Sequence, residues 1–442
     1  MEAKFFYKEL NKLMLPIAFQ AFMLALVAAS DTIMLGFVSQ GQLAAVSLAT
    51  RVQFVQNIGI AGLVGGGLII CAQLYGRKEI DKINKIFATM TKYVAILSII
   101  FWGVSFFAPD FLMRIFTNDT NMIEIGSQYL KIASWSYLIV GITQCYITMM
   151  RVGNKANLAM ISSLSVVVNI ILNAFFIFGL FGIPKMEARG AALATVIARI
   201  IELGITVVLF TKIKDIKLKI VNIFKIDLSL DKLFLKMSAP IFLNESIWGI
   251  GITIYSVFIG HLGEEATAAN SIASVIKDLV TSLCRGIGVG GGILLGYKLG
   301  VNDFETAKRY GNKLLKLSVI VGIVCSVLVL ALSPISNLFE LSSKANSYLW
   351  IMILICMVYM IAKSINICAI NGIFYAGGDT KFDAYSLGVT MWGIIIPLAA
   401  IATFICSWPV LVIYLIISLD EIIKIPWVFI HYKKYKWLKN IT

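Results

Sequence analysis

A carboxylate inside a long apolar stretch is the side chain in this sequence best placed to do chemistry. Asp31 has no basic residue near it in the sequence, and Asn169 and Asn173 stand four residues apart in a second apolar stretch. That spacing puts both amides on one face of a helix, and a third stretch adds the hydroxyl of Thr195. A carboxylate, two amide oxygens and a hydroxyl suit a hard cation such as sodium, with Asp31, Asn169 and Asn173 as ligands. A proton on Asp31, with the amides hydrogen-bonded to the carboxyl group, fits equally well.

A second carboxylate, Glu245, also lies in an apolar stretch. It suits a second ion or a cationic substrate, or else it pairs with one of the basic residues Lys277, Arg285 and Lys363. Lys363 has no acid close to it in the sequence, and we expect it to meet an acid from the seventh or eighth apolar stretch. Tyr255 could line a pocket for bulky cations.

These residues must be positioned by helices that cross a membrane. The chain is 59% hydrophobic and 14% charged, which is more apolar surface than a soluble protein of 442 residues can bury. Runs of about 20 apolar residues span a bilayer as helices, because no water satisfies the backbone there. We therefore predict an all-α integral membrane protein with twelve transmembrane helices, approximately 12–36, 48–74, 89–109, 128–150, 158–181, 188–211, 238–262, 272–296, 313–334, 346–372, 385–406 and 410–431.

The chain contains an internal repeat. Lys12 to Gly76 aligns without a gap to Lys236 to Gly300, with five glycine pairs and the pair Pro16/Pro240 in register. We predict two parallel six-helix repeats, an N-lobe over 1–221 and a C-lobe over 222–442, joined by a basic linker at about 212–232. Duplicated membrane folds are typical of transporters. Asp31 falls on Tyr255 in the repeat, so the fold itself does not require the carboxylate.

The basic residues are distributed unevenly along this topology. Most lie in the termini and the even-numbered connections, and the odd-numbered connections hold only Arg114, Lys185, Arg189 and Lys344. The positive-inside rule then places both termini in the cytoplasm. The net charge of +14 reflects membrane insertion and contact with anionic lipid, not binding of nucleic acid. We expect a monomeric, multi-pass protein of the cell (inner) membrane.

Motifs for catalysis and nucleotide binding do not occur in the sequence. The glycine runs 62–67 and 286–292 lack the Lys-Ser/Thr that follows a phosphate loop. We expect no enzyme activity, no catalytic residue and no cofactor. Transport must then draw on a gradient of Na⁺ or H⁺ as the coupling ion, unless the chain is a facilitator.

Several motifs together resemble the multidrug and toxic compound extrusion (MATE) family, and the likeness extends over essentially the whole chain. They are Ser30-Asp31-Thr32 with Met34 and Gly36, Leu43-Ala44-Ala45, Gln73-Leu74-Tyr75-Gly76, the segment Gly190 to Thr195, and the segment Asn371 to Thr380.

The resemblance implies cation-coupled export of amphipathic organic cations by alternating access. Asp31 matches the family's coupling carboxylate, and Asn169, Asn173 and Thr195 match residues around it. Some members carry an aspartate where Asn173 stands, which leaves sodium and proton coupling both open.

The resemblance also bears on the second half. Glu245 matches an acid of one subgroup, and Asn371 lies near a position where some bacterial members have an acid. We expect a second cation or substrate site at Glu245, Tyr255 and Asn371. Tyr375 departs from the arginine of many members.

Pro16 removes a helix hydrogen bond about four turns before Asp31. We expect the first span to bend there, as a gate, when Asp31 changes its charge.

Three alternatives remain. A flippase for lipid-linked oligosaccharides or cell-wall precursors would need cavity cations for pyrophosphate, which Arg51, Lys277, Arg285 or Lys363 could supply. A major-facilitator carrier would need a Gly-x-x-x-Asp-Arg-x-Gly loop that the sequence lacks. A membrane scaffold or sensor fits poorly with twelve spans.

Overall fold

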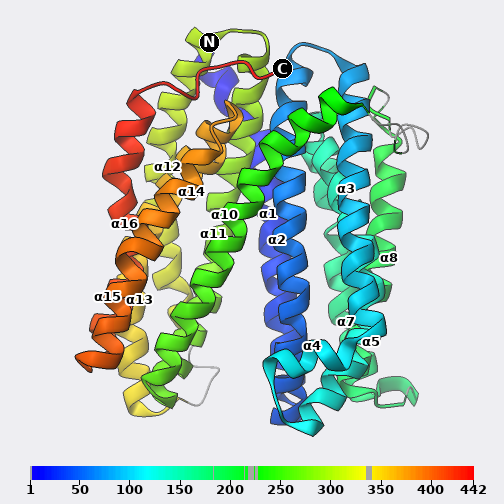
Figure 1. Ribbon diagram of the computed structural model, residues 1–442, viewed down its shortest axis with the longest axis vertical. Coiled ribbons are helices and arrows are strands. Elements are labelled where there is room, and N and C mark those ends of the chain that lie inside the picture. The colour runs from blue at the N-terminus through cyan, green and yellow to red at the C-terminus, as the bar shows by residue number, and fades with distance from the viewer. Residues whose placement is uncertain (1, 183, 214, 218–222, 224–226, 335–340) are drawn as a thin grey trace. The chain divides into compact units, whose positions relative to one another are not determined.

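The computed structural model describes residues 2–182, 184–213, 215–217, 223, 227–334 and 341–442, and every regular element in these ranges is helical. The elements of the first half (Figure 1) are α1 (Glu2–Gly36), α2 (Gln40–Gly76), α3 (Ile80–Phe107), α4 (Pro109–Phe116), α5 (Thr120–Val152), α6 (Ala156–Ile161), α7 (Leu164–Phe178), η1 (Leu180–Gly182) and α8 (Glu187–Phe210). Those of the second half are α10 (Leu228–His261), α11 (Glu264–Gly300), α12 (Phe304–Leu332), α13 (Ser343–Asn366), η3 (Ile367–Phe374), α14 (Lys381–Leu387), η4 (Gly388–Ile395), α15 (Ile396–Ala400), η5 (Ile401–Ile405) and α16 (Val410–Lys433).

The predicted all-helical membrane fold is confirmed. Eleven helical stretches among the described residues are long and apolar enough to cross a membrane. The remaining predicted span, 410–431, is helix α16, which differs in carrying the charged residues Asp420, Glu421 and Lys424.

Two predicted spans are less regular than expected. The fifth span is interrupted at Ser162 and Ser163, where the Ser162 hydroxyl donates to the Ala159 carbonyl oxygen at 2.7 Å. The eleventh widens into π turns on both sides of Pro397. Proline cannot donate to the carbonyl one turn earlier, and its ring collides with that carbonyl. A locally wider turn relieves this conflict.

The chain forms two compact units that divide three of the helices. Unit 1 comprises Met1–Phe22, Ala72–Lys78 and Leu243–Thr442, and unit 2 comprises Met23–Cys71 and Glu79–Phe242. The first turns of α1 and the end of α2 therefore belong with the second half of the chain, and the first turns of α10 with the first half. The predicted boundary between residues 221 and 222 lies outside the described residues, and the division into 1–221 and 222–442 stays a prediction.

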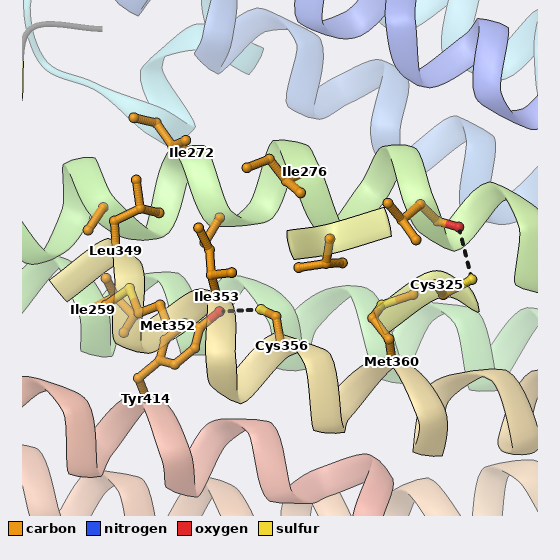
Figure 2. Packing of buried hydrophobic residues seen from close by; sticks show 14 of the residues in the cluster. Ile259, Ile272, Ile276, Cys325, Leu349, Met352, Ile353, Cys356, Met360 and Tyr414 are labelled. Atoms are coloured by element: carbon orange, nitrogen blue, oxygen red, sulfur yellow. Dashed lines mark hydrogen bonds between the residues drawn. The ribbon is translucent and has the colours of Figure 1, made fainter. Parts of the chain in front are cut away.

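Each unit has its own apolar core. In unit 2, α5 packs against α3 and α8, and α7 packs against α8. In unit 1, α13 contacts α11, α12 and α16 (Figure 1). Figure 2 shows the core of unit 1, where the Tyr414 hydroxyl and the Cys356 sulfur lie 3.1 Å apart among Ile353, Met352 and Leu349. Burial of these apolar side chains between helices makes each unit close-packed.

The glycines of the internal repeat serve the same packing purpose in both units. In unit 2, a Cβ on Gly62 would lie 2.6 Å from the Phe242 Cα of α10. In unit 1, a Cβ on Gly286 would lie 2.7 Å from the Ala18 Cβ of α1. Ala18 is the repeat partner of Phe242, so the repeat conserves a close contact between helices. Small residues are what such contacts require in a membrane.

The segments that follow α8 and α16 fold back in a related way. Ile216 is fully buried and approaches Gly153, while Trp437 is fully buried and packs on Gly377, the repeat partner of Gly153. The second of these segments continues to the end of α2, where the Gln73 side chain accepts a hydrogen bond from the Ile441 amide at 2.8 Å. This hydrogen bond joins the last turn of α2 to the C-terminal segment of unit 1.

The glycine contacts predict a matched set of stability effects. Gly62→Val and Gly286→Val should each destabilise their unit by about 1–3 kcal/mol, because the added side chain meets backbone that cannot move aside. Gly204→Val is the control, since a Cβ there meets nothing within 4 Å. Thermal unfolding of the purified variants measures the effect, and equal melting temperatures for Gly204→Val and Gly286→Val would contradict the prediction.

Candidate functional site

Asp31 and the two asparagines of α7 come together inside unit 2. The Asn173 amide nitrogen donates to an Asp31 carboxylate oxygen at 2.5 Å and to the Asn169 amide oxygen at 3.2 Å. Asn173 is fully buried and Asn169 nearly so. Their four-residue spacing puts both on the same face of α7, and Gly179 ends the helix in a left-handed conformation, as is usual for a C-terminal glycine.

Thr195 uses its hydroxyl differently. It donates to the Ala191 carbonyl oxygen of its own helix at 2.9 Å, so its oxygen lone pairs remain the part able to bind a cation. One turn further along α8, Arg199 pairs with Glu202 at 2.6 Å. The Arg199 guanidinium also interacts electrostatically with Asp31.

The hydrogen bonding around Asn173 leaves one buried polar atom without a partner in the described part of the chain. Both bonds use the Asn173 amide nitrogen, and its carbonyl oxygen is buried with no donor. A buried amide oxygen without a partner is costly. A cation beside Asp31, or a proton on the carboxyl group, would supply what this oxygen lacks after the amide turns over.

Glu245 lies in unit 1 beside a second polar cluster. The neighbouring Asn244 side chain donates to Asp383 at 2.7 Å, and the Tyr375 hydroxyl donates to the same Asp383 oxygen at 2.5 Å. Glu245 interacts electrostatically with Asp383, but its carboxylate forms no hydrogen bond or ion pair with any residue that the structure describes. The unit thus places a hydrogen-bonded carboxylate close to a half-buried one that has no hydrogen bond within the described residues.

Lys363 meets a different partner from the one expected. The prediction that it pairs with an acid of the seventh or eighth span is wrong, because its ammonium group binds Glu421 of α16 at 2.6 Å. Asn366 donates to the other Glu421 carboxylate oxygen at 2.7 Å. The Lys363 ammonium group therefore neutralises this buried acid, and the Asn366 amide helps to orient it.

The other residues predicted for the second site lie on α10 and η3. Tyr255 follows it by ten residues on α10, about 15 Å along the helix axis, and its hydroxyl is buried without a partner among the described residues. Asn371 is half-buried in the π turn η3. The roles proposed for these residues stay predictions.

Pro16 is buried within α1, which continues through it as a single helix. It lies in the part of α1 that belongs to unit 1, whereas Asp31 lies in the part that belongs to unit 2.

Asp383 and Asn366 are buried polar residues that the sequence does not single out. Asp383 follows a turn and precedes an apolar run, so it looks like an ordinary first-turn acid of a helix. Only the packing of α14 beside α10 and η3 shows that it is buried. The one available signal was a carboxylate eight residues after the unusual Tyr375.

Two repeated halves of membrane-spanning helices, with buried carboxylates in each, define a multi-pass membrane transporter. The family model MatE matches residues 16–175 and 240–401, segments that begin at the repeat-related prolines Pro16 and Pro240. The chain belongs to the MatE family of multidrug and toxic compound extrusion (MATE) transporters, which are not enzymes.

Individual proteins support this assignment. The Probable multidrug resistance protein YoeA of Bacillus subtilis (strain 168) is 24% identical over 344 residues, covering 76% of this chain and 74% of that protein. The Probable multidrug resistance protein NorM of Bacillus cereus (strain ATCC 10987 / NRS 248) is 24% identical over 414 residues, covering 91% and 89%. A solved MOP superfamily transporter from Pyrococcus furiosus Vc1 superposes with a TM-score of 0.87 at 18% identity, covering 97% of this chain and 95% of that one.

The Lys363–Glu421 pair predicts a non-additive effect on stability. Lys363→Met should cost about 3–5 kcal/mol, because it leaves a buried carboxylate without its counter-charge. The double variant Lys363→Met/Glu421→Leu should recover much of that loss, since both charges are then gone. Thermal unfolding of the two single variants and the double variant measures the coupling, and strictly additive losses would contradict it.

Proposed function

We propose that this protein is a cation-coupled antiporter that exports amphipathic, drug-like organic cations by alternating access. The observation that carries the proposal is the buried contact between Asp31 and Asn173. A carboxylate within a membrane-spanning helix needs a strong reason to be there, and here it is held by amide groups that can also receive an incoming ion. The relatives named as multidrug resistance proteins support small drug-like molecules as the substrates.

The same residues accommodate either coupling ion. Sodium would bind the Asp31 carboxylate together with the Asn169 and Asn173 amide oxygens, since oxygen ligands suit a hard cation. A proton would convert Asp31 from an acceptor into a donor toward the Asn173 oxygen. Sodium requires the Asn173 amide to turn over, because the nitrogen that now faces Asp31 cannot contact a cation, and a proton on Asp31 pairs with the Asn173 oxygen only after the same turn. Ion binding therefore changes how α1 and α7 are joined.

Coupling follows if the ion and the substrate favour different conformations of the protein. A ligand shifts an equilibrium only through its different affinities for the two states. We infer that inward movement of Na⁺ or H⁺ to Asp31 stabilises the state that releases the substrate outward. The basic termini and even-numbered connections support a cytoplasmic location for both ends.

The flippase alternative has less support. Two of the four cations that could bind pyrophosphate are engaged elsewhere: Lys363 is neutralised by Glu421, and Lys277 lies over the Tyr359 ring at 5.3 Å.

Replacing Asp31 tests coupling directly. We expect Asp31→Asn to abolish ethidium efflux from proteoliposomes under an imposed sodium gradient or proton gradient, because the amide carries no charge to exchange for a cation. In the wild type, the gradient that drives efflux identifies the coupling ion. Asp110→Asn is the matched control, since it removes an exposed carboxylate at the start of α4 in the same unit. Efflux retained by Asp31→Asn would make Asp31 a structural carboxyl.

Pro16 provides a separate test of gating. We expect Pro16→Ala to bind ethidium normally but to transport it several-fold more slowly, because restoring the helix hydrogen bond to Lys12 stiffens α1 where it must bend. Binding is measured by fluorescence in detergent and transport in proteoliposomes. Wild-type transport rates in this variant would remove Pro16 from the mechanism.

A further inference from the structure

Helix α11 exposes a single polar face. Its described side chains that are exposed are Thr267, Ser271, Val275, Asp278 and Arg285. Their spacing of three, four and seven residues places them in one stripe along the helix. The opposite side of α11 is buried in the core of unit 1, through residues such as Ile272, Ile276 and Cys284.

This stripe is unsuited to lipid. Asp278 and Arg285 lie in the middle third of a 37-residue helix, where a charge that faces hydrocarbon is costly. Hydroxyl and charged groups on one face of a membrane-spanning helix are typical of a surface that meets water or a ligand. We therefore take this face to be wetted.

Arg285 is not committed to another residue. Its guanidinium interacts electrostatically with Glu245, yet no ion pair or hydrogen bond joins Arg285 to any residue in the described ranges. The equivalent face of α2 in unit 2 exposes Ser47, Arg51 and Ala61, and Ala61 is the repeat partner of Arg285. Both halves therefore expose the equivalent face of this helix. The guanidinium of Arg285 occurs in only one of them, so the fold does not require it.

We propose that Arg285 is a specificity-determining residue, which extends the substrates from simple cations to amphipathic zwitterions that carry a carboxylate as well as a cationic group. This inference rests on the proposed antiport function. The Arg285 guanidinium binds the substrate carboxylate, a planar group that it can contact through two parallel hydrogen bonds. Asp278 stands seven residues earlier, about 10 Å along the helix, and attracts the cationic end. The two charges on one face therefore fix the orientation of an elongated zwitterion.

A pair of dyes isolates this contact. A rhodamine with a free carboxylate is a zwitterion at neutral pH, and its methyl ester is a cation of nearly the same shape. We expect wild-type protein to bind and export both, and Arg285→Gln to lose about tenfold in affinity and efflux for the acid dye, since hydrogen bonds to charged groups contribute that much. The ester should be affected less than twofold. Arg285→Lys should recover part of the acid-dye activity, because it restores the charge but not the planar fork.

The outcomes separate the two proposals. Equal losses for both dyes in Arg285→Gln, no loss for either, or a wild type that handles only the ester or neither dye would each overturn the role of Arg285. Asp31→Asn should lose gradient-driven efflux of both dyes while still binding them. If Asp31→Asn exports both dyes and Arg285→Gln still loses only the acid dye, coupling at Asp31 is wrong and the specificity assignment stands. Binding is followed by fluorescence anisotropy of the full chain in nanodiscs, and export in proteoliposomes.

Discussion

A charged side chain within a membrane-spanning helix must be given hydrogen-bond donors, a counter-charge or an ion, because the bilayer supplies none of them. The two units meet this constraint in different ways. Unit 2 gives Asp31 an amide, which holds a carboxylate without neutralising it. Unit 1 gives Glu421 a lysine and an asparagine, which neutralise it and fix its position. The first is the arrangement in which we propose that a cation replaces the amide, whereas in the second the acid is held in a salt bridge.

The internal repeat separates the residues that pack the helices, which occur in both halves, from the charged residues, which do not. The repeated glycines make the same close helix contacts in each unit, as Gly62 and Gly286 do. The charges are not repeated: Asp31 corresponds to Tyr255, and Arg285 corresponds to Ala61. The close helix contacts are therefore repeated independently of the charges, which is consistent with the proposed roles of Asp31 in ion coupling and of Arg285 in substrate binding.

The helices could be predicted from the sequence because a span is a local property. Apolar length and helical spacing determine it, and each predicted span contains a helix. The pairing of Asn169 with Asn173 was predictable for the same reason, since both lie on one helix. The partner of Lys363 was not, because Glu421 lies far away in the chain and meets it only after α13 packs on α16. Asp383 was missed for the same reason.

The course of α1 links the hydrogen bond at Asp31 to the proposed bend at Pro16. Residues up to Phe22 belong to unit 1 and those from Met23 to unit 2, so one helix carries Pro16 in one unit and Asp31 in the other. A continuous α-helix transmits rotation and tilt along its length, and it bends most readily where a hydrogen bond is already missing. In the mechanism we propose, an ion replaces the bond between Asp31 and Asn173, which would free the part of α1 in unit 2 to shift against α7. The part in unit 1 is held by close packing on Gly286, so the proposed movement would be absorbed near Pro16. Coupling between two ligands requires an element whose two arrangements both ligands favour differently, and in the proposed mechanism α1 is that element.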